Sequence, residues 1–221
     1  MAFSRRTLAF GGLVAAVALA VPFAAVADDT DLASELRAGG LVILLRHGPT
    51  FPNQADTDPL HPDNIAAQRN LNDAGKAMAG SFGDAIRRIG APIGKVYTSL
   101  LNRAHETAVL AGFTDIEKTV DLTETSTAMG RPADIEAGRV VSSDEKNRRA
   151  DALRKMLGTM PKAGTNTVIV THKPNIIDAL GNDWSDVKEG EASIFRPGNN
   201  GSYRLVARVQ MDEWPRLAAE R

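Results

Sequence analysis

Two histidines in this sequence follow short apolar runs that are typical of buried strands. Arg46-His47-Gly48 comes directly after the run 41–45, and His172 comes directly after the run 167–171. Continuous apolar runs of this length favour strands that are buried on both faces of a sheet. Ligands of an open α/β sheet bind outside the carboxyl ends of its strands, so the two histidines can meet although 125 positions separate them. They are therefore candidate catalytic residues.

Two arginines accompany these histidines. Arg46 precedes His47, and Arg103 lies in the first turn of a helix that is predicted to follow a third strand at 95–98. A cation in the first helical turn opposes the helix dipole unless an anion is nearby. Two histidines and two arginines at three strand ends predict an oxyanion pocket. Phosphate fits such a pocket best, because guanidinium groups bind its oxygens bidentately.

The elements that must position these residues alternate along the chain. Loops without periodicity are expected at 51–70 and 121–142. Helices and strands are expected from apolar spacing, from caps at Asn72 and Ser142, and from Pro174 in a first helical turn. The expected helices are 72–89, 102–111, one between Ser142 and Gly158, and one beginning at Pro174, and the expected strands are 41–45, 95–98, 167–171, 192–195 and 203–209. This order predicts one three-layer α/β/α domain with a mostly parallel central sheet.

The first 27 residues are typical of an export signal. Arg5-Arg6 precedes an uncharged run rich in Ala, Val, Leu and Gly, and Ala25-Val26-Ala27 has the form of a cleavage site. The paired arginines resemble a twin-arginine signal, so we expect residues 1–27 to be removed and residues 28–221 to form the mature domain in the periplasm or outside the cell. An uncleaved membrane anchor is the alternative, since the run is long enough to span a bilayer. After cleavage no stable membrane association is expected.

Composition excludes several function classes. The chain of 221 residues has 26 Lys and Arg against 27 Asp and Glu, so its net charge of -1 favours no binding to nucleic acid or to an anionic membrane. It contains no cysteine, which excludes disulfides, thiolate metal sites and a cysteine nucleophile. The four histidines show no spacing typical of a zinc site, so no metal is expected.

Four ordered motifs resemble the histidine phosphatase superfamily in its phosphoglycerate-mutase-like branch. They span essentially the whole predicted mature chain, and they are Leu45-Arg46-His47-Gly48, Leu71-Asn72-Asp73-Ala74-Gly75, Thr98-Ser99 with Arg103-Ala104-His105-Glu106-Thr107-Ala108, and Val170-Thr171-His172. The resemblance implies that His47 is the nucleophile that becomes phosphorylated. It implies that the transferred phosphoryl group binds to Arg46, Arg103 and His172, with further contacts from Thr50 and Asn53. It also implies a small phosphorylated substrate, no metal and no cofactor.

A carboxylic acid must protonate the leaving oxygen and later activate water. This branch commonly carries that residue after the Arg103 helix, which implies Glu124, and Asp121 is the second candidate. Lys173 can add a cation at the pocket rim or can be a solvated surface residue. Arg69 can reach the distal part of the substrate or can be a salt-bridged loop residue.

Two histidines are expected to take no part in the site. His105 is two positions after Arg103 in the same predicted helix and therefore points elsewhere. His61, beside Pro62, is expected to be exposed.

Three functions remain open at this stage. The first is an exported phosphatase that works through phospho-His47. The second is a phosphotransferase or mutase, which is disfavoured because Pro49 stands where mutases often have Glu and the Gly-Glu-Trp type of segment is missing after Glu124. The third is a non-catalytic module that binds a phosphorylated ligand.

Overall fold

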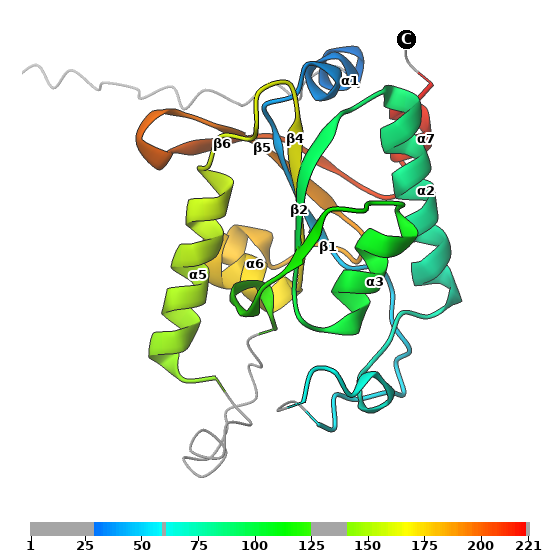
Figure 1. Cartoon of the computed structure of the whole chain (residues 1–221), viewed down its shortest axis with the longest axis vertical. Coiled ribbons are helices and arrows are strands. Elements are labelled where there is room, and N and C mark those ends of the chain that lie inside the picture. The colour runs from blue at the N-terminus through cyan, green and yellow to red at the C-terminus, as the bar shows by residue number, and fades with distance from the viewer. Residues whose placement is uncertain (1–28, 59–60, 125–140, 220–221) are drawn as a thin grey trace, which may run out of the picture.

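A six-stranded sheet forms the centre of the molecule (Figure 1). The computed structural model describes residues 29–58, 61–124 and 141–219. The strands are β1 (Val42–Arg46), β2 (Ile93–Thr98), β3 (Ile116–Lys118), β4 (Asn166–Thr171), β5 (Ala192–Pro197) and β6 (Tyr203–Val209). Their order across the sheet is β3-β2-β4-β1-β5-β6.

The four strands β1 to β4 are mutually parallel, so their carboxyl ends meet at one edge. β1 and β4 are neighbours, with Arg46 in register with Thr171. β5 pairs antiparallel with β1, and β6 pairs antiparallel with β5. The mostly parallel sheet confirms the prediction and places the residues after β1 and β4 side by side.

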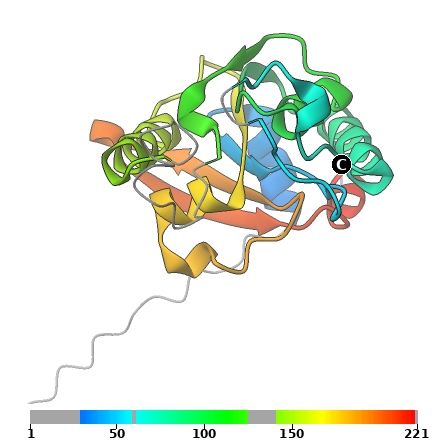
Figure 2. The ribbon, with the colours of Figure 1, turned by 90° about the horizontal axis from the view of Figure 1, so that it is seen from below.

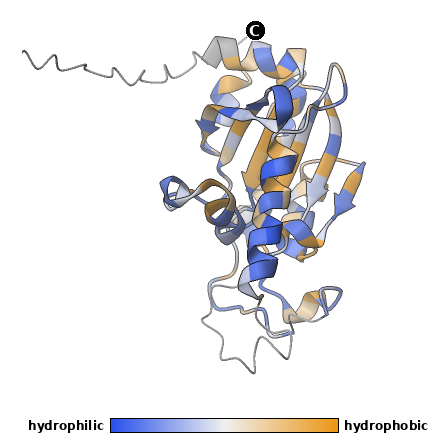
Figure 3. Cartoon of the chain, turned by 90° about the vertical axis from the view of Figure 1, so that its left-hand side faces the viewer, coloured by the Kyte–Doolittle hydropathy of each residue, from blue (hydrophilic) through white to orange (hydrophobic). Residues whose placement is uncertain are grey.

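Helices cover both faces of the sheet, as Figure 2 shows from below. α1 (Asp29–Ala38), α2 (Asp73–Ile89), α3 (Asn102–Leu110) and α7 (Trp214–Leu217) contribute to the apolar core on one face, and α5 (Ser143–Leu157) and α6 (Lys173–Leu180) contribute to the core on the other. β1 supplies both cores, since Ile43 and Leu45 face the first and Val42 and Leu44 the second. The central strands are mostly apolar, while α5, in front in Figure 3, is hydrophilic on its outer side.

The helices that follow the two expected loops are capped as predicted. Asn72 accepts a hydrogen bond from the amide of Gly75 at 2.9 Å, which caps α2. Ser142 accepts one from the amide of Glu145 at 3.2 Å and caps α5. A Cβ on Gly48 would lie 3.1 Å from the Cα of Gly75, so glycine at both positions lets the chain after β1 pass close to the start of α2.

The ten-residue helix α1, the short edge strand β3 and the short helix α7 are absent from the sequence-based prediction. The expected signal segment 1–27 and most of the expected loop 121–142 lie outside the described residues. In the described part of the chain, no helix is both long enough and apolar enough to span a membrane.

Candidate active site

The two predicted histidines lie side by side at the carboxyl ends of β1 and β4. The amide of His47 donates to the carbonyl oxygen of Thr171 at 3.1 Å, which continues the parallel pairing past the end of β1. The two rings are tilted by 60°, with 5.1 Å between their centroids. His47 is 2% exposed and His172 is 0% exposed, so both rings are inside the protein.

The ring of His47 is held in one orientation by the backbone. Its Nδ1 lies 2.8 Å from the carbonyl oxygen of Gly48. A carbonyl oxygen can only accept, so Nδ1 carries the proton and Nε2 carries the lone pair. Burial and the nearby charge of Arg103 lower the pKa of His47 to about 3. The imidazole is therefore neutral near pH 7, and its Nε2 can act as a nucleophile.

Ser99 sets the protonation of the second histidine. Its Oγ accepts from the amide of Leu101 at 2.9 Å and lies 2.8 Å from Nε2 of His172. The Ser99 hydroxyl proton has no other acceptor among the hydrogen bonds of the described residues, so we assign it to Nε2, which places the proton of the neutral ring on Nδ1. Burial, followed by the charge of Arg103, lowers the pKa of His172 well below its ordinary value. A neutral His172 thus offers one donor, Nδ1.

Arg103 is fully buried in the first turn of α3, and two carboxylates compensate its charge. Asp56 receives hydrogen bonds from Nη1 at 3.0 Å and from Nη2 at 3.1 Å. Glu124 accepts from Nη2 as well, and the carbonyl oxygen of Arg69 accepts from Nη1 at 3.3 Å. These are the anions that a cation at this helical position requires. All four Nη hydrogens are engaged, which leaves the Nε–H.

Arg46 is held by the segment before β5. Its Nη1 donates to the carbonyl oxygen of Val187 at 2.7 Å, and its Nη2 lies 3.4 Å from a carboxylate oxygen of Glu189. Burial lowers its pKa, and the attraction of Glu189 opposes that shift. Because these contacts engage the Nη groups, the Nε–H of Arg46 is left for another acceptor.

Three buried donors of this cluster therefore have no acceptor among the described residues: Nε of Arg46, Nε of Arg103 and Nδ1 of His172. A buried polar group without a hydrogen bond costs roughly 1–3 kcal/mol. Three such donors beside the lone pair of His47 suit an acceptor with several oxygens. A phosphoryl group has this form and carries the compensating charge.

Glu124 lies within this cluster. Its Oε2 is 3.7 Å from Nδ1 of His172 and 3.8 Å from Nη2 of Arg69, in addition to its contact with Arg103. Asp121, the second candidate acid, instead pairs with Arg148 at 2.8 Å. The structure therefore brings Glu124, and not Asp121, to His172.

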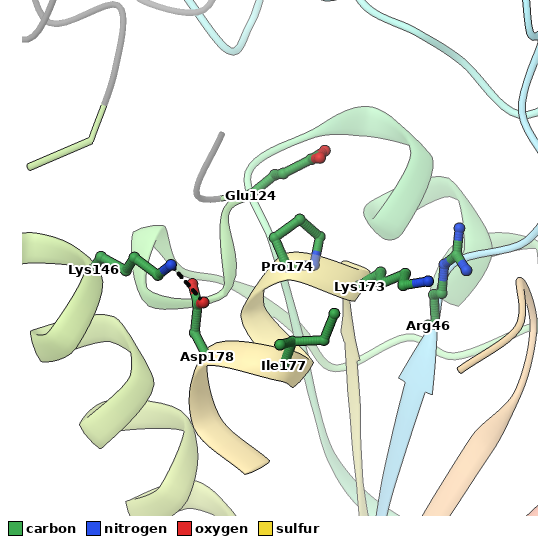
Figure 4. Close-up of a pocket in the computed structure, with 7 residues that line it drawn as sticks. All are labelled: Arg46, Glu124, Lys146, Lys173, Pro174, Ile177 and Asp178. Atoms are coloured by element: carbon green, nitrogen blue, oxygen red, sulfur yellow. Dashed lines mark ion pairs between the residues drawn. The ribbon is translucent and has the colours of Figure 1, made fainter. Parts of the chain in front are cut away.

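The other residues that the sequence predicts for the site, Thr50, Asn53, Arg69 and Lys173, differ in how far they are buried. Thr50 is buried and forms an isolated bridge with Leu71, while Asn53 is exposed in the loop after β1. Arg69 is half-buried and reaches Glu124. Lys173, the first residue of α6, lines a pocket together with Arg46 (Figure 4).

The other two histidines lie apart from the cluster, as expected. His61 is largely exposed and contacts Asp58 at 2.7 Å. His105 is in α3, where burial followed by the charge of Lys118 lowers its pKa. Within the described residues, no group of three or more His, Asp or Glu has an arrangement that could hold a metal ion.

Sequence reasoning missed the partners of the predicted residues. Asp56 is 47 positions from Arg103, and its only signal is an acidic residue in a loop rich in Asp and Asn. Ser99 stands inside a quoted motif, but its contact with His172 depends on the pairing of β2 with β4. The deficit of anions around Arg103 was the one signal that could have pointed to Asp56.

Fold and site together define a three-layer α/β protein with a buried histidine and arginine cluster suited to an oxyanion. Residues 42–136 match the family model described as histidine phosphatase superfamily (branch 1), and this stretch contains the first three of the four motifs that carry the resemblance. This match includes His47, Arg103 and Glu124, and the sheet adds His172 from beyond it. No curated protein matches the chain in sequence.

Solved structures share the fold. YhfR of Bacillus stearothermophilus has a TM-score of 0.54 at 17% identity, over 76% of this chain and 95% of that chain. The mycobacterial glucosyl-3-phosphoglycerate phosphatase in complex with VO3 has a TM-score of 0.52 at 18% identity, over 76% and 97%. A phosphoserine phosphatase mutant from Entamoeba histolytica, in complex with phosphoserine, has a TM-score of 0.50 at 17% identity, over 77% and 97%. At these identities the likeness shows the fold.

Proposed function

We propose that this protein is a phosphatase that hydrolyses a small phosphomonoester through a phosphohistidine on His47. The observation that carries the proposal is that Arg46, Arg103 and His172 each have a buried donor without a partner, while the ring of the neutral His47 lies 5.1 Å from that of His172. The family match and the phosphatases among the structures of the same fold support it.

In the first step, Nε2 of His47 attacks phosphorus and the bond from phosphorus to the ester oxygen breaks. The donors on Arg46, Arg103 and His172 bind the non-bridging oxygens and stabilise their charge, which is most of what phosphoryl transfer asks of a protein. The leaving oxygen takes a proton from Glu124, the carboxyl group next to the cluster, which therefore enters this step in its protonated form although it faces Arg103 in the ligand-free site.

In the second step, water gives a proton to Glu124 and attacks phosphorus while the bond to Nε2 breaks. Phosphate leaves, His47 returns to its neutral form, and Glu124 is protonated again. The hydrogen bond from Nδ1 to Gly48 keeps the same ring nitrogen directed at phosphorus in both steps.

We also propose that the enzyme needs no metal and that it works outside the cytoplasm. Arg46 and Arg103 supply the positive charge that metal ions supply in other phosphoryl-transfer sites. Export is supported by three features of residues 1–27: the paired arginines, the apolar run and the Ala-Val-Ala sequence typical of a cleavage site.

The test is rapid quenching of the mature chain with labelled p-nitrophenyl phosphate. We expect an acid-labile, base-stable phosphoprotein in the wild type and in His61→Ala, and none in His47→Asn. Turnover should persist after dialysis against EDTA. Phosphate binding without turnover would favour a non-catalytic module, and transfer of label to an acceptor alcohol instead of water would favour a phosphotransferase.

A further inference from the structure

A buried carboxylate outside the histidine and arginine cluster lies at the start of β5. The side chain of Glu191 is only 1% exposed, and the residue directly precedes Ala192, the first residue of that strand. An ionised carboxylate this deep in a protein is costly unless cations and hydrogen-bond donors surround it. The reaction steps proposed above do not involve this group.

Three donors of the described residues satisfy the carboxylate of Glu191. Its Oε1 accepts from Nε of Arg208 at 2.5 Å, and its Oε2 accepts from Nε2 of Gln210 at 2.6 Å and from the amide of Lys188 at 3.2 Å. The two side-chain donors come from β6 and from the residue after it, and the amide belongs to the turn 187–191 that leads into β5. The carboxylate therefore connects this turn to β6.

The same turn holds both the side chain and the backbone of Arg46. The carbonyl oxygen of Val187 accepts from Nη1 at 2.7 Å, and a carboxylate oxygen of Glu189 lies 3.4 Å from Nη2. The amide of Arg46 donates to the carbonyl oxygen of Glu191 at 3.0 Å, and the amide of Gly190 donates to the carbonyl oxygen of Arg46 at 3.1 Å. These contacts fix the plane of the guanidinium group. The direction of its remaining donor, the buried Nε–H, thus depends on the shape of the turn.

Both ends of the connection are held in place. The amide of Glu191 donates to the carbonyl oxygen of Lys188 at 3.1 Å, so the backbone and the side chain of Glu191 both bind that residue. The guanidinium group of Arg208 lies 5.9 Å from the ring centroid of Trp184. A carboxamide at position 191 has one oxygen where the carboxylate has two, so its NH2 group would face either the Nε–H of Arg208 or the amide of Lys188. Glutamine at this position would therefore weaken the connection at nearly unchanged size.

We propose that Glu191 is a positioning residue for Arg46. Its carboxylate, balanced by Arg208, fixes the turn 187–191, and the turn directs the Nε–H of Arg46 at the phosphoryl group. The proposal rests on the proposed function, in which this donor binds a non-bridging oxygen. Hydrogen bonds weaken steeply as their geometry departs from linear, so a small shift of the turn is enough to reduce the contribution of Arg46.

The test is a double-mutant cycle on the mature chain. It is measured as the affinity for inorganic phosphate by calorimetry and as kcat/KM for p-nitrophenyl phosphate. Glu191→Gln should lower both about tenfold, which is the scale of one hydrogen bond to a charged group. In an Arg46→Ala background the same change should have an effect of less than about twofold, because the residue through which it acts is gone.

Asp186→Asn is the matched control. Asp186 accepts from Nη2 of the same Arg208 at 2.9 Å, but its side chain is 72% exposed, so the change removes a surface ion pair and leaves the contacts of Glu191 in place. It should leave the phosphate affinity and kcat/KM unchanged.

Arg208→Gln is a second variant, and it carries the test if Glu191→Gln does not fold. It keeps a neutral donor for the carboxylate of Glu191 and removes the charge, so we expect a loss of about threefold in the presence of Arg46 and none in the Arg46→Ala background. Urea unfolding of every variant separates a loss of fold from a loss of affinity.

Equal losses with and without Arg46 would overturn the role given to Glu191, and so would an unchanged phosphate affinity in Glu191→Gln. Failure of the proposed function has a different signature. The wild-type protein would then hydrolyse no p-nitrophenyl phosphate, while the coupling between Arg46 and Glu191 in phosphate affinity would still be measured.

Discussion

At the scale of single residues, the site depends on which nitrogen of each imidazole carries the proton. Gly48 directs the lone pair of His47 outward through Nε2, and Ser99 directs the proton of His172 outward through Nδ1. One ring can thus attack while the other donates. Neither partner titrates, so both arrangements hold wherever the two rings are neutral.

Replacement of Ser99 should remove the hydrogen bond that fixes the proton of the His172 ring on one nitrogen. In Ser99→Ala the Nε2 of His172 loses its donor, both neutral tautomers become accessible, and we expect kcat to fall roughly 10-fold to 100-fold, toward the scale of one lost donor. Nitrogen chemical shifts of the His172 ring should report a protonated Nδ1 in the wild type and a mixture in the variant.

Ser193→Ala is the control for this change. Ser193 is equally buried, and its hydroxyl accepts from Trp184 at 3.0 Å, so the variant loses a comparable hydrogen bond away from the site. It should leave the His172 shifts unchanged. A single Nδ1-protonated ring in Ser99→Ala would contradict the role given to Ser99.

Removal of the proton donor should depend on the leaving group. Glu124→Gln should slow hydrolysis of alkyl phosphates more than that of p-nitrophenyl phosphate, whose phenolate leaves without a proton, by a further factor of roughly 10² to 10⁴. Steady-state kinetics on both substrates measures this factor. Asp121→Asn should show no such dependence, because Asp121 pairs with Arg148 instead. The same signature in Asp121→Asn would move the role to that residue.

Residue types and spacing were sufficient to predict the centre of the site. His47 and His172 each directly follow an apolar strand, and parallel strands must end at one edge. The residue that compensates the charge of Arg103 could not be predicted, because Asp56 contacts Arg103 only after the loop 51–70 folds over α3. The roles of all these residues in catalysis stay predictions until the variants are measured.

At the scale of elements, this loop is tied to the start of α3. Gln68 accepts from the amide of Asn102 at 2.7 Å, and Asp56 accepts both from Arg103 and from the amide of Arg69 at 2.9 Å. The loop thus supplies the capping groups that α3 lacks in its own sequence.

Weakening this connection should cost stability as well as activity. In Asp56→Asn the buried Arg103 keeps only Glu124 as a charged partner, and we expect the free energy of unfolding to fall by about 1–3 kcal/mol, the usual cost of a buried group that loses a partner. Urea titration followed by circular dichroism measures the change. Asp63→Asn replaces an exposed residue of the same loop, and it should leave the midpoint of the urea titration unchanged. An equal loss in both variants would rule out the Arg103 contact as the cause.

Element prediction worked where periodicity and caps agree. α2 and α5 begin as predicted because Asn72 and Ser142 bind their own first turns, and β1 and β4 are continuous apolar runs. β3 was missed because it has three residues at the sheet edge, two of them exposed and charged. α7 has only four residues and is held by burial of Trp214, which a local pattern cannot reveal.

At the scale of the whole molecule, the buried histidines make folding depend on pH. The pKa of His47 is about 3 in the folded protein against about 6.5 in an unfolded chain, so between these values the unfolded state binds a proton that the folded state does not. His172 shifts in the same direction. Stability should therefore fall as pH is lowered through 6.5, by about 1.4 kcal/mol per pH unit for each histidine.

Urea unfolding at pH 6.5 and pH 5.0, above the range in which most carboxylates titrate, measures this slope. His47→Asn should have a shallower slope than the wild type. His61→Asn should match the wild type, because that ring is largely exposed in the folded protein. A wild-type slope of zero would mean that the two histidines take up protons without unfolding.

The order of the strands also affects how the chain is made. β4 lies between β1 and β2, although it follows both by more than sixty residues in the sequence. A nascent chain that has left the ribosome only as far as residue 124 therefore cannot join its first two strands, and the apolar edges of both remain unpaired. The last of the parallel strands to be synthesised closes this gap, and it also delivers His172. The joining of the parallel strands and the arrival of His172 at the candidate site are thus a single late event, and chains truncated before it should aggregate.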